Sequence, residues 1–225
     1  MNVVVVGASR GIGAAVAAHC AGRGDSVWSV SRSPAVAGQW IKADVTTPAG
    51  RSRIMDCLGS SHLDALLYMG GTWEHGAFTA QYDFRKSGYE ETLAVLSVNL
   101  IAPIELTRLL VPNLTLSINP RAIFIGALSG FDNQATPEVA NTASKFGLRG
   151  AIQALRLALQ SEGIGFTVVN PGNVATPEVL DDIKEGRFPE QTPIPMRDLL
   201  ATIDWILTLS NSVDVGDLAL LQRFG

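Results

Sequence analysis

The sequence predicts an α/β fold with a doubly wound parallel sheet of about seven strands and helices on both faces. Two observations favour this class. Strand-like and helix-like hydrophobic patterns alternate along the whole chain. Several strand-like runs are continuously apolar, which is typical of parallel strands buried on both faces. The 225 residues contain no internal repeat or linker, so we expect one domain over residues 1–225.

The first half of the chain opens with the buried-strand pattern at 3–6, where four valines follow one another. An Ala/Val-rich helix pattern covers 12–22, and glycines end it. Two further β-branched or aromatic runs predict strands at 26–30 and 40–43.

The middle of the chain continues the alternation. Apolar positions at helical spacing predict a helix over 49–58, and the apolar run at 63–68 predicts the fourth strand, which glycines end. The pattern over 89–110 predicts one long helix.

The last third repeats the same units. The expected strands cover 122–126, 166–169 and 218–221, and the expected helices cover 141–161 and 197–209. Thr176-Pro177-Glu178 supplies a capping hydroxyl, a first-turn proline and an early acid for one more short helix, which Gly186 would end.

Composition narrows the class of protein. Hydrophobic residues make up 47% and charged residues 17% of the chain, which indicates a buried core. The formal net charge is −4 and no Lys/Arg block occurs, so we expect neither nucleic acid nor membrane as a partner. No signal peptide is recognised and no apolar run is expected to span a bilayer, which predicts a cytoplasmic protein. Cys20 and Cys57 match no metal-ligand spacing, and we expect both to be buried and no metal site.

A glycine-rich turn directly follows the first predicted strand and precedes the first predicted helix. Glycines let the backbone approach a phosphate closely, and a helix N-terminus offers free N–H groups and a favourable dipole. A Rossmann-type dinucleotide site is therefore predicted, with a turn that binds no ligand as the alternative. Its residues are Gly7, Ser9, Arg10, Gly11, Ile12 and Gly13.

Topology predicts which other segments belong to this site. Ligands of parallel α/β sheets bind beyond the carboxyl ends of the strands. That rim would bring together segments that are far apart in the sequence. They are Gly7–Gly13, Ser31-Arg32, Asp44, Gly70–His75, Gly126–Gly130 and Asn170–Thr176.

With these residues the chain resembles the short-chain dehydrogenase/reductase family over nearly its whole length. The glycine turn matches the phosphate loop of that family, and Asp44-Val45 matches its adenine-contacting pair. Asn99 fits its structural and catalytic asparagine, and Lys145 fits the lysine of its Tyr-x-x-x-Lys motif. The segment Tyr68-Met69-Gly70-Gly71 occupies the place of the family's Asn-Asn-Ala-Gly motif, and Tyr68 and Met69 replace its two asparagines. Pro171, Gly172, Val174 and Thr176 fit the segment that holds the nicotinamide carboxamide.

The resemblance implies a nicotinamide cofactor and an oxidoreductase. At the end of the second strand, an acidic residue would bind the ribose hydroxyls and repel a 2′-phosphate. Here Ser31 stands at that place, with Arg32 after it and Arg10 in the glycine turn, so NADP(H) is favoured over NAD(H). The resemblance also implies a homo-oligomer, a dimer or tetramer, built on the helices around 93–110 and 146–159.

Two positions depart from the family pattern. Asn141 stands where the family has its tyrosine, four residues before Lys145, and Ala127 stands where it has its serine. An asparagine amide donates a hydrogen bond but exchanges no proton near neutral pH, and alanine does neither. The resemblance therefore implies a retained cofactor half and an altered proton-transfer half, with Asn99, Lys145 and Asn141 as catalytic candidates.

Other side chains are candidates for the altered role. Ser129 would face the same side as Ala127 if the strand continued, and a plain turn residue is the alternative. Tyr68 offers a phenol at the end of the fourth strand, or else packs in the core. Glu74 and His75 form a candidate acid–base pair, although a loop position favours solvated polar residues.

We expect an NADP(H)-binding oxidoreductase of divergent mechanism that acts on a small, mostly apolar carbonyl or alcohol. Residues 176–195 are expected to form a lid with an apolar face, and packing against the sheet rim is the alternative. The apolar residues of this face are Val179, Leu180, Ile183 and Phe188. Two other functions remain open. One is a catalytically silent cofactor-binding sensor or partner subunit, and the other is a non-redox isomerase, lyase or cyclase.

Overall fold

The computed structural model describes residues 1–188 and 190–223. Within them, seven strands form one parallel sheet in the order β3-β2-β1-β4-β5-β6-β7, which confirms the predicted doubly wound fold. The strands are β1 (Asn2–Val6), β2 (Ser26–Ser31), β3 (Gln39–Lys42), β4 (Ala65–Tyr68), β5 (Arg121–Ile125), β6 (Gly165–Pro171) and β7 (Asp217–Leu220). Each lies within a few residues of its expected position.

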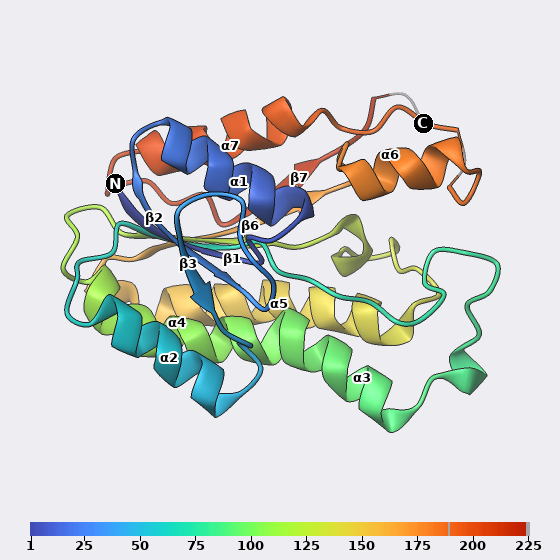
Figure 1. Cartoon of the computed structure of the whole chain (residues 1–225), viewed down its shortest axis with the longest axis horizontal. Coiled ribbons are helices and arrows are strands. Elements are labelled where there is room, and N and C mark those ends of the chain that lie inside the picture. The colour runs from blue at the N-terminus through green and yellow to red at the C-terminus, as the bar shows by residue number, and fades with distance from the viewer. Residues whose placement is uncertain (189, 224–225) are drawn as a thin grey trace.

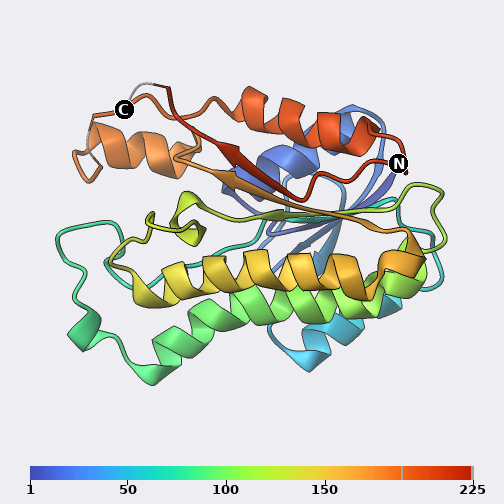
Figure 2. The same ribbon diagram turned by 180° about the vertical axis from the view of Figure 1, so that it is seen from behind.

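Helices cover both faces of the sheet (Figures 1 and 2). One face carries α1 (Gly11–Gly22) and α7 (Met196–Thr208), with α6 (Pro177–Lys184) beside them. The other face carries α2 (Pro48–Leu58), α3 (Tyr89–Leu96), α4 (Ala102–Leu114) and α5 (Val139–Ala158). A parallel sheet needs such cover on both sides because its strands are buried on both faces.

The four valines of β1 show how the sequence builds this core. Val4 and Val6 belong to the apolar cluster that contains buried residues of α2, α4 and α5. Val3 and Val5 belong to the cluster on the opposite face, with buried residues of α1 and α7. Successive side chains of a strand point to opposite faces, so a strand covered on both sides is apolar throughout.

The helix expected over 89–110 extends to Leu114 and contains a π-helical turn over Ser97–Ile101. Such turns are rare and occur frequently at functional sites. By length and composition the stretch 89–114 could span a membrane, so the expectation that no run reaches that length is wrong. In the structure, α4 packs Leu106 and Leu110 into the core of the sheet, which explains its apolar composition.

The two cysteines differ in exposure. Cys20 is buried, as expected, and burial raises its pKa to about 11. Cys57 is exposed on α2, so the expectation that both thiols are buried is wrong for this residue.

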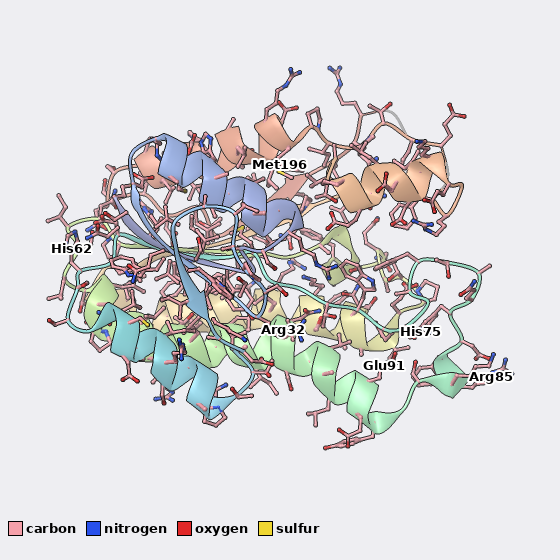
Figure 3. All side chains as sticks on the ribbon, viewed as in Figure 1. Arg32, His62, His75, Arg85, Glu91 and Met196 are labelled. Carbon is pink, nitrogen blue, oxygen red and sulfur yellow. The ribbon has the colours of Figure 1, made fainter. Side chains whose placement is uncertain are left out.

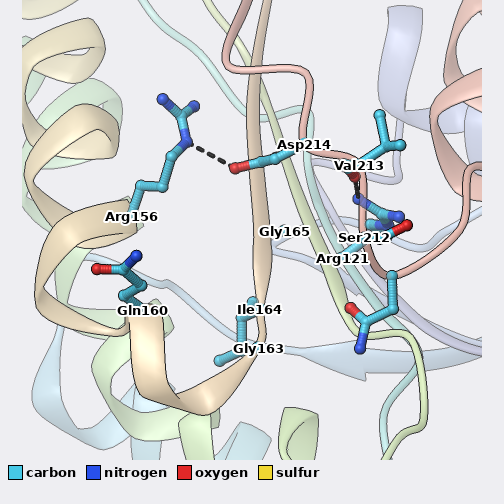
Figure 4. Close-up of a pocket in the computed structure, with 10 residues that line it drawn as sticks. Arg121, Arg156, Gln160, Gly163, Ile164, Gly165, Ser212, Val213 and Asp214 are labelled. Carbon is cyan, nitrogen blue, oxygen red and sulfur yellow. Dashed lines mark hydrogen bonds and ion pairs between the residues drawn. The ribbon is translucent and has the colours of Figure 1, made fainter.

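A buried arginine ties the amino edge of the sheet to the end of α7. Arg121 begins β5, and its Nη atoms donate to the carbonyls of Leu209, Ser210 and Val213 at 2.7–2.8 Å. Positive charge is favourable just after a helix C-terminus. A cavity of about 280 Å³ lies beside it (Figure 4), and its other arginine, Arg156, pairs with a carboxylate at 2.6 Å. This cavity lies at the amino edge, opposite the rim where ligands of such sheets bind.

Candidate functional site

The glycine turn after β1 forms a tight loop that leaves the start of α1 uncapped. Gly7 has φ +85°, and its N–H donates to the Val30 carbonyl at 2.9 Å. A Cβ atom at Gly13 would lie 2.2 Å from the carbonyl oxygen of Gly7, so only glycine fits there. Arg10 provides no side-chain cap, and the first turn of α1 contains no acidic residue. The N–H groups at this helix start are therefore available to an anion.

Two arginines line a cavity of about 400 Å³ beyond the end of β2. Arg10, Arg32 and Ser9 line it together with two residues of the loop after β2. Neither guanidinium forms an ion pair with any residue that the structure describes. The Ser31 hydroxyl is buried and donates to the Ser33 carbonyl at 2.7 Å. The arrangement can bind a phosphate group, because guanidinium groups match phosphate geometry.

The loops after β3 and β4 lie on the same rim. Asp44 Oδ1 accepts the N–H and the hydroxyl of Thr46 at 2.9 and 2.6 Å. The hydrogen bond from that hydroxyl lowers the pKa of Asp44, against the opposing effect of burial. Val45 packs partly against the core. Gly70 approaches the glycine turn so closely that a Cβ at Gly7 would lie 2.8 Å from it.

Asn99 lies at the centre of a buried hydrogen-bond network. Its side chain is 1% exposed, accepts the Thr72 N–H at 2.9 Å and donates to the Thr72 carbonyl at 2.8 Å. It also donates to the Ser144 hydroxyl, which in turn donates to the Asn141 carbonyl at 2.6 Å. The network joins the loop after β4, the π-helical turn and α5. A satisfied buried network of this kind fixes the positions of its members.

Lys145 lies near Asn99, at the same part of the site. Its side chain is 8% exposed, and Nζ donates to the Ile125 carbonyl at 3.2 Å. Burial lowers its pKa to about 8. A Cβ at Gly71 would lie 3.9 Å from Nζ and 3.8 Å from Asn99 Oδ1, so these two groups flank that glycine. Asn141 lies one helical turn before Lys145 and is buried.

Tyr68 occupies a different environment from the one a proton donor needs. Its side chain is 1% exposed, stacks on Phe124 and donates its hydroxyl to the Val98 carbonyl at 2.7 Å. Burial raises the pKa of this phenol well above its usual value. The interpretation of Tyr68 as a replacement phenol is therefore not supported, and its role is in the core.

Ser129 lies in a turn, which is the alternative given above to a continuing strand. β5 ends at Ile125, and Leu128–Gly130 form a 3₁₀ turn, so the alternation of a continuing strand does not apply. The Ser129 hydroxyl is buried and has no hydrogen-bond partner among the described residues. Ala127 is half-buried and extended between strand and turn.

The loop over 72–82 caps the N-terminus of α5 through Glu74. This side chain was expected to be solvated, but it is 2% exposed. Its Oε1 accepts the N–H groups of Ala140 and Asn141 at 2.7 and 3.2 Å. The cap joins residues 66 and 67 positions apart, and no local sequence pattern reports a contact over that separation.

Two further contacts hold the same loop, and sequence reasoning missed both. Glu138 precedes α5, and its Oε1 accepts the Phe78 N–H at 2.7 Å. The Tyr82 hydroxyl accepts the Val139 N–H at 3.2 Å. Phe78 has φ +63°, a conformation that bulky residues rarely adopt.

His75 does not share the environment of Glu74. Its side chain is exposed, and its N–H donates to Glu91 Oε1 at 2.6 Å (Figure 3). The structure therefore does not bring Glu74 and His75 together as an acid–base pair, because one is buried against α5 and the other faces solvent.

The segment after β6 leaves the sheet and returns to it. Val174 and Ile194 form a parallel bridge. The bridge holds together the two ends of the segment that contains α6. Thr176 caps α6 through the Val179 N–H, as expected. Leu180 on this helix is 48% exposed, whereas full packing against the rim would bury it. Position 189, inside the expected lid, lies outside the described residues.

The segment that contains α6 lies close to the glycine turn after β1 and to the loop after β4. A Cβ at Gly11 would lie 3.8 Å from Glu178 and 3.9 Å from Thr176, so α6 starts beside the glycine turn. The ring of Phe188 contacts that of Phe78, with 6.5 Å between centroids. Pro171 ends β6 and is buried, and Gly172 donates its N–H to the neighbouring β7. Figure 1 shows α6 and the loop after β4 at the same end of the molecule.

Sequence comparison finds relatives along most of the chain. A family model described as short chain dehydrogenase matches residues 1–185. The short chain dehydrogenase ausX of Penicillium brasilianum is 29% identical over 205 residues, which cover 83% of this chain and 73% of that protein. The ketoacyl reductase HetN of a Nostoc species is 31% identical over 191 residues, covering 77% and 63%.

Solved structures share the fold. A short chain dehydrogenase family protein from Francisella tularensis has a TM-score of 0.81 at 22% identity, with 97% of this chain and 96% of that chain covered. The complex of Pseudomonas aeruginosa RhlG with NADP has a TM-score of 0.79 at 21% identity, covering 98% and 94%. A 4-hydroxyisoleucine dehydrogenase complexed with NADH has a TM-score of 0.79 at 19% identity, covering 97% and 96%.

Proposed function

This chain belongs to the short-chain dehydrogenase family, and from that premise we propose that it is an NADP(H)-dependent oxidoreductase. Its substrate would be a small, mostly apolar carbonyl or alcohol, and its place of action the cytoplasm. Structural neighbours in complex with NADP and with NADH support a nicotinamide cofactor.

The observation that carries the choice of NADP(H) is the cavity of Arg10 and Arg32. Two guanidinium groups without ion-pair partners among the described residues lie at the carboxyl end of β2, beside the hydroxyl of Ser9. A 2′-phosphate would satisfy both groups by charge-assisted hydrogen bonds. An acidic residue at the end of β2 would repel this phosphate, and the residue there is Ser31, whose hydroxyl is already bonded within the loop.

The rest of the cofactor would be held by backbone and by two buried side chains. The uncapped start of α1 and the room left by Gly7 and Gly13 fit a pyrophosphate. Lys145 and Asn99 would bind and orient the nicotinamide ribose, and the segment from Pro171 to Thr176 would hold the carboxamide. When bound, the nicotinamide supplies or accepts a hydride.

We expect the site to have few side chains that could transfer a proton to the substrate. We propose that Asn141 and Ala127 stand at the positions of the family's tyrosine and serine, so neither can pass a proton to a substrate oxygen. Lys145 is the remaining buried donor, since burial lowers its pKa to about 8. Loss of a general acid typically costs about 10²- to 10⁴-fold in rate, so carbonyl reduction is expected to be slow.

We further propose that the chain assembles as a homo-oligomer, a dimer or tetramer. Helix α5 and the π-helical turn before α4 carry large apolar side chains that are exposed in the single chain. They are Ile101, Phe146 and Leu157. A second copy would remove these groups from water, which is the usual driving force of such association.

Cofactor preference tests this function directly. We expect calorimetric titration to show tighter binding of NADPH than of NADH. Arg32→Glu is expected to weaken NADPH binding by about 10- to 100-fold, because it replaces a charge-assisted bond to the 2′-phosphate with repulsion. Arg53→Glu is the control, since Arg53 is exposed on α2 and does not line the cavity. Equal affinities for both cofactors, unchanged by Arg32→Glu, would contradict the assignment.

A further inference from the structure

Glu74 is a buried side chain whose carboxyl group is only half satisfied. Oε1 accepts two N–H groups at the start of α5, whereas Oε2 has no hydrogen-bond partner in the described part of the chain. A buried polar atom without a partner is uncommon and points to a ligand, water or ion at that place. Negative charge is favoured at a helix N-terminus, so a positively charged donor is the ligand that suits Oε2 best.

Glu74 belongs to the same loop that contacts Asn99, a residue of the proposed reaction centre. Thr72, two residues earlier in the loop, is bound to Asn99 by two hydrogen bonds. Asn141, whose N–H donates to Glu74, precedes Lys145 by one helical turn, about 6 Å along the axis. The loop therefore runs from Asn99 to the start of α5, where two backbone N–H groups hold the carboxyl group of Glu74.

No described side chain supplies the missing positive charge. Lys145 Nζ donates to the Ile125 carbonyl, and no ion pair formed within residues 1–188 and 190–223 includes Glu74. Glu138, directly before α5, adds a second buried carboxyl oxygen without a partner. An unpaired buried carboxylate is costly, and a bound cation would offset that cost.

We propose that Glu74 binds a protonated nitrogen of the substrate, and that this substrate is a small, mostly apolar imine taken up as its iminium ion. The inference rests on the hydride-transfer function proposed above and narrows its substrate class. The N–H of the iminium ion donates to Oε2, and its charge pairs with the carboxylate in a place shielded from water.

An iminium substrate removes the need for a proton donor at the positions of Asn141 and Ala127. A carbonyl oxygen gains negative charge when its carbon accepts a hydride, so its reduction needs a proton or a strong donor. The iminium nitrogen already carries its proton. Its carbon accepts the hydride as a C–H bond forms, the C=N π pair returns to nitrogen, and a neutral amine results while the dihydronicotinamide is oxidised. Glu74 holds the cation and transfers no proton.

Binding of an ammonium ion tests the inference without turnover. The full chain, loaded with NADPH, is titrated with pyrrolidinium and with tetrahydrofuran, a neutral ring of the same size. We expect pyrrolidinium alone to bind. Glu74→Gln should weaken that binding by about 30-fold or more, because glutamine keeps the Oε1 acceptor for α5 but lacks the charge. Glu90→Gln, which removes the charge of an exposed glutamate on α3, should leave it unchanged.

Turnover provides the second test. NADPH oxidation is followed with 2-methyl-1-pyrroline as its conjugate acid and with cyclopentanone as the matched ketone. We expect kcat/KM for the imine to be higher by about 10²-fold or more, the usual contribution of a general acid. Glu74→Gln should lower it by about the same factor as the binding of pyrrolidinium.

The outcomes separate this inference from the function on which it rests. If NADPH does not bind, the proposed function fails, and the inference fails with it. If NADPH binds but pyrrolidinium does not, only the inference is overturned. It is also overturned if Glu74→Gln binds pyrrolidinium as tightly as the wild type, or if the ketone is reduced as fast as the imine.

Discussion

Gly13→Ala is expected to weaken NADPH binding severely and to lower the melting temperature. The new Cβ would lie 2.2 Å from the carbonyl oxygen and 2.6 Å from the carbonyl carbon of Gly7. Ordinary carbon contacts lie near 3.5–4.0 Å, and both neighbours are backbone atoms of the loop that would cradle the phosphates. The loop must shift by about 1 Å or more. We expect a loss of about 100-fold or more in affinity and about 1–3 kcal/mol in stability.

Gly22→Ala is the matched control for this change. Gly22 ends the same helix, and a Cβ there would meet no atom within 4 Å. Alanine should be neutral or stabilise by up to about 1 kcal/mol. Thermal denaturation and calorimetric titration of both variants give the comparison. Wild-type NADPH affinity in Gly13→Ala would show that the glycine turn does not contact the cofactor.

Lys145→Met is expected to stabilise the fold at neutral pH while weakening cofactor binding. Burial lowers the pKa of Lys145 from 10.5 to about 8, a difference that corresponds to about 3 kcal/mol. Below pH 8 the lysine is charged in both states, so the folded state bears the whole cost of burying the charge. Methionine fills a similar volume without that cost. Urea denaturation at pH 7 should therefore show a gain of up to about 3 kcal/mol.

The same substitution should change how stability depends on pH. Between about pH 8 and 10.5 the unfolded chain keeps a proton that the folded chain has lost, so wild-type stability rises with pH across this window. Lys145→Met should lack this rise, while Lys42→Met, at an exposed lysine, should keep it. A Lys145→Met protein less stable than the wild type at pH 7 would show that the buried ammonium stabilises the fold.

Much of the fold and the phosphate-binding part of the candidate site could be predicted, because the sequence patterns that indicate them are local. The four valines of β1 and the glycines that follow are each read from neighbours in the sequence. The position of Asn99 beside Lys145 followed from the resemblance. For Ser129 and Tyr68, local patterns left a catalytic role and a structural role both open. The choice depends on where β5 stops and on the backbone carbonyl of Val98, which accepts the Tyr68 hydroxyl.

Glu74 is the clearest case of a residue that local patterns place wrongly. A glutamate in a polar loop after a strand is usually solvated, and nothing near it in the sequence indicates otherwise. Its burial results from the approach of α5, more than 60 positions later. The π-helical turn at Ser97–Ile101 is similar, because the apolar spacing around it matches an ordinary helix.

The capping of α5 by the 72–82 loop gives the site a built-in reporter. Three successive amides, those of Val139, Ala140 and Asn141, donate to side chains of this loop rather than to their own helix. Their deuterium uptake therefore measures how often the 72–82 loop detaches from the start of α5. Deuterium uptake at later amides of α5 measures the opening of the helix itself. A ligand that tightens the loop would slow exchange at these three positions, so ligand binding could be followed in unlabelled protein without a known reaction.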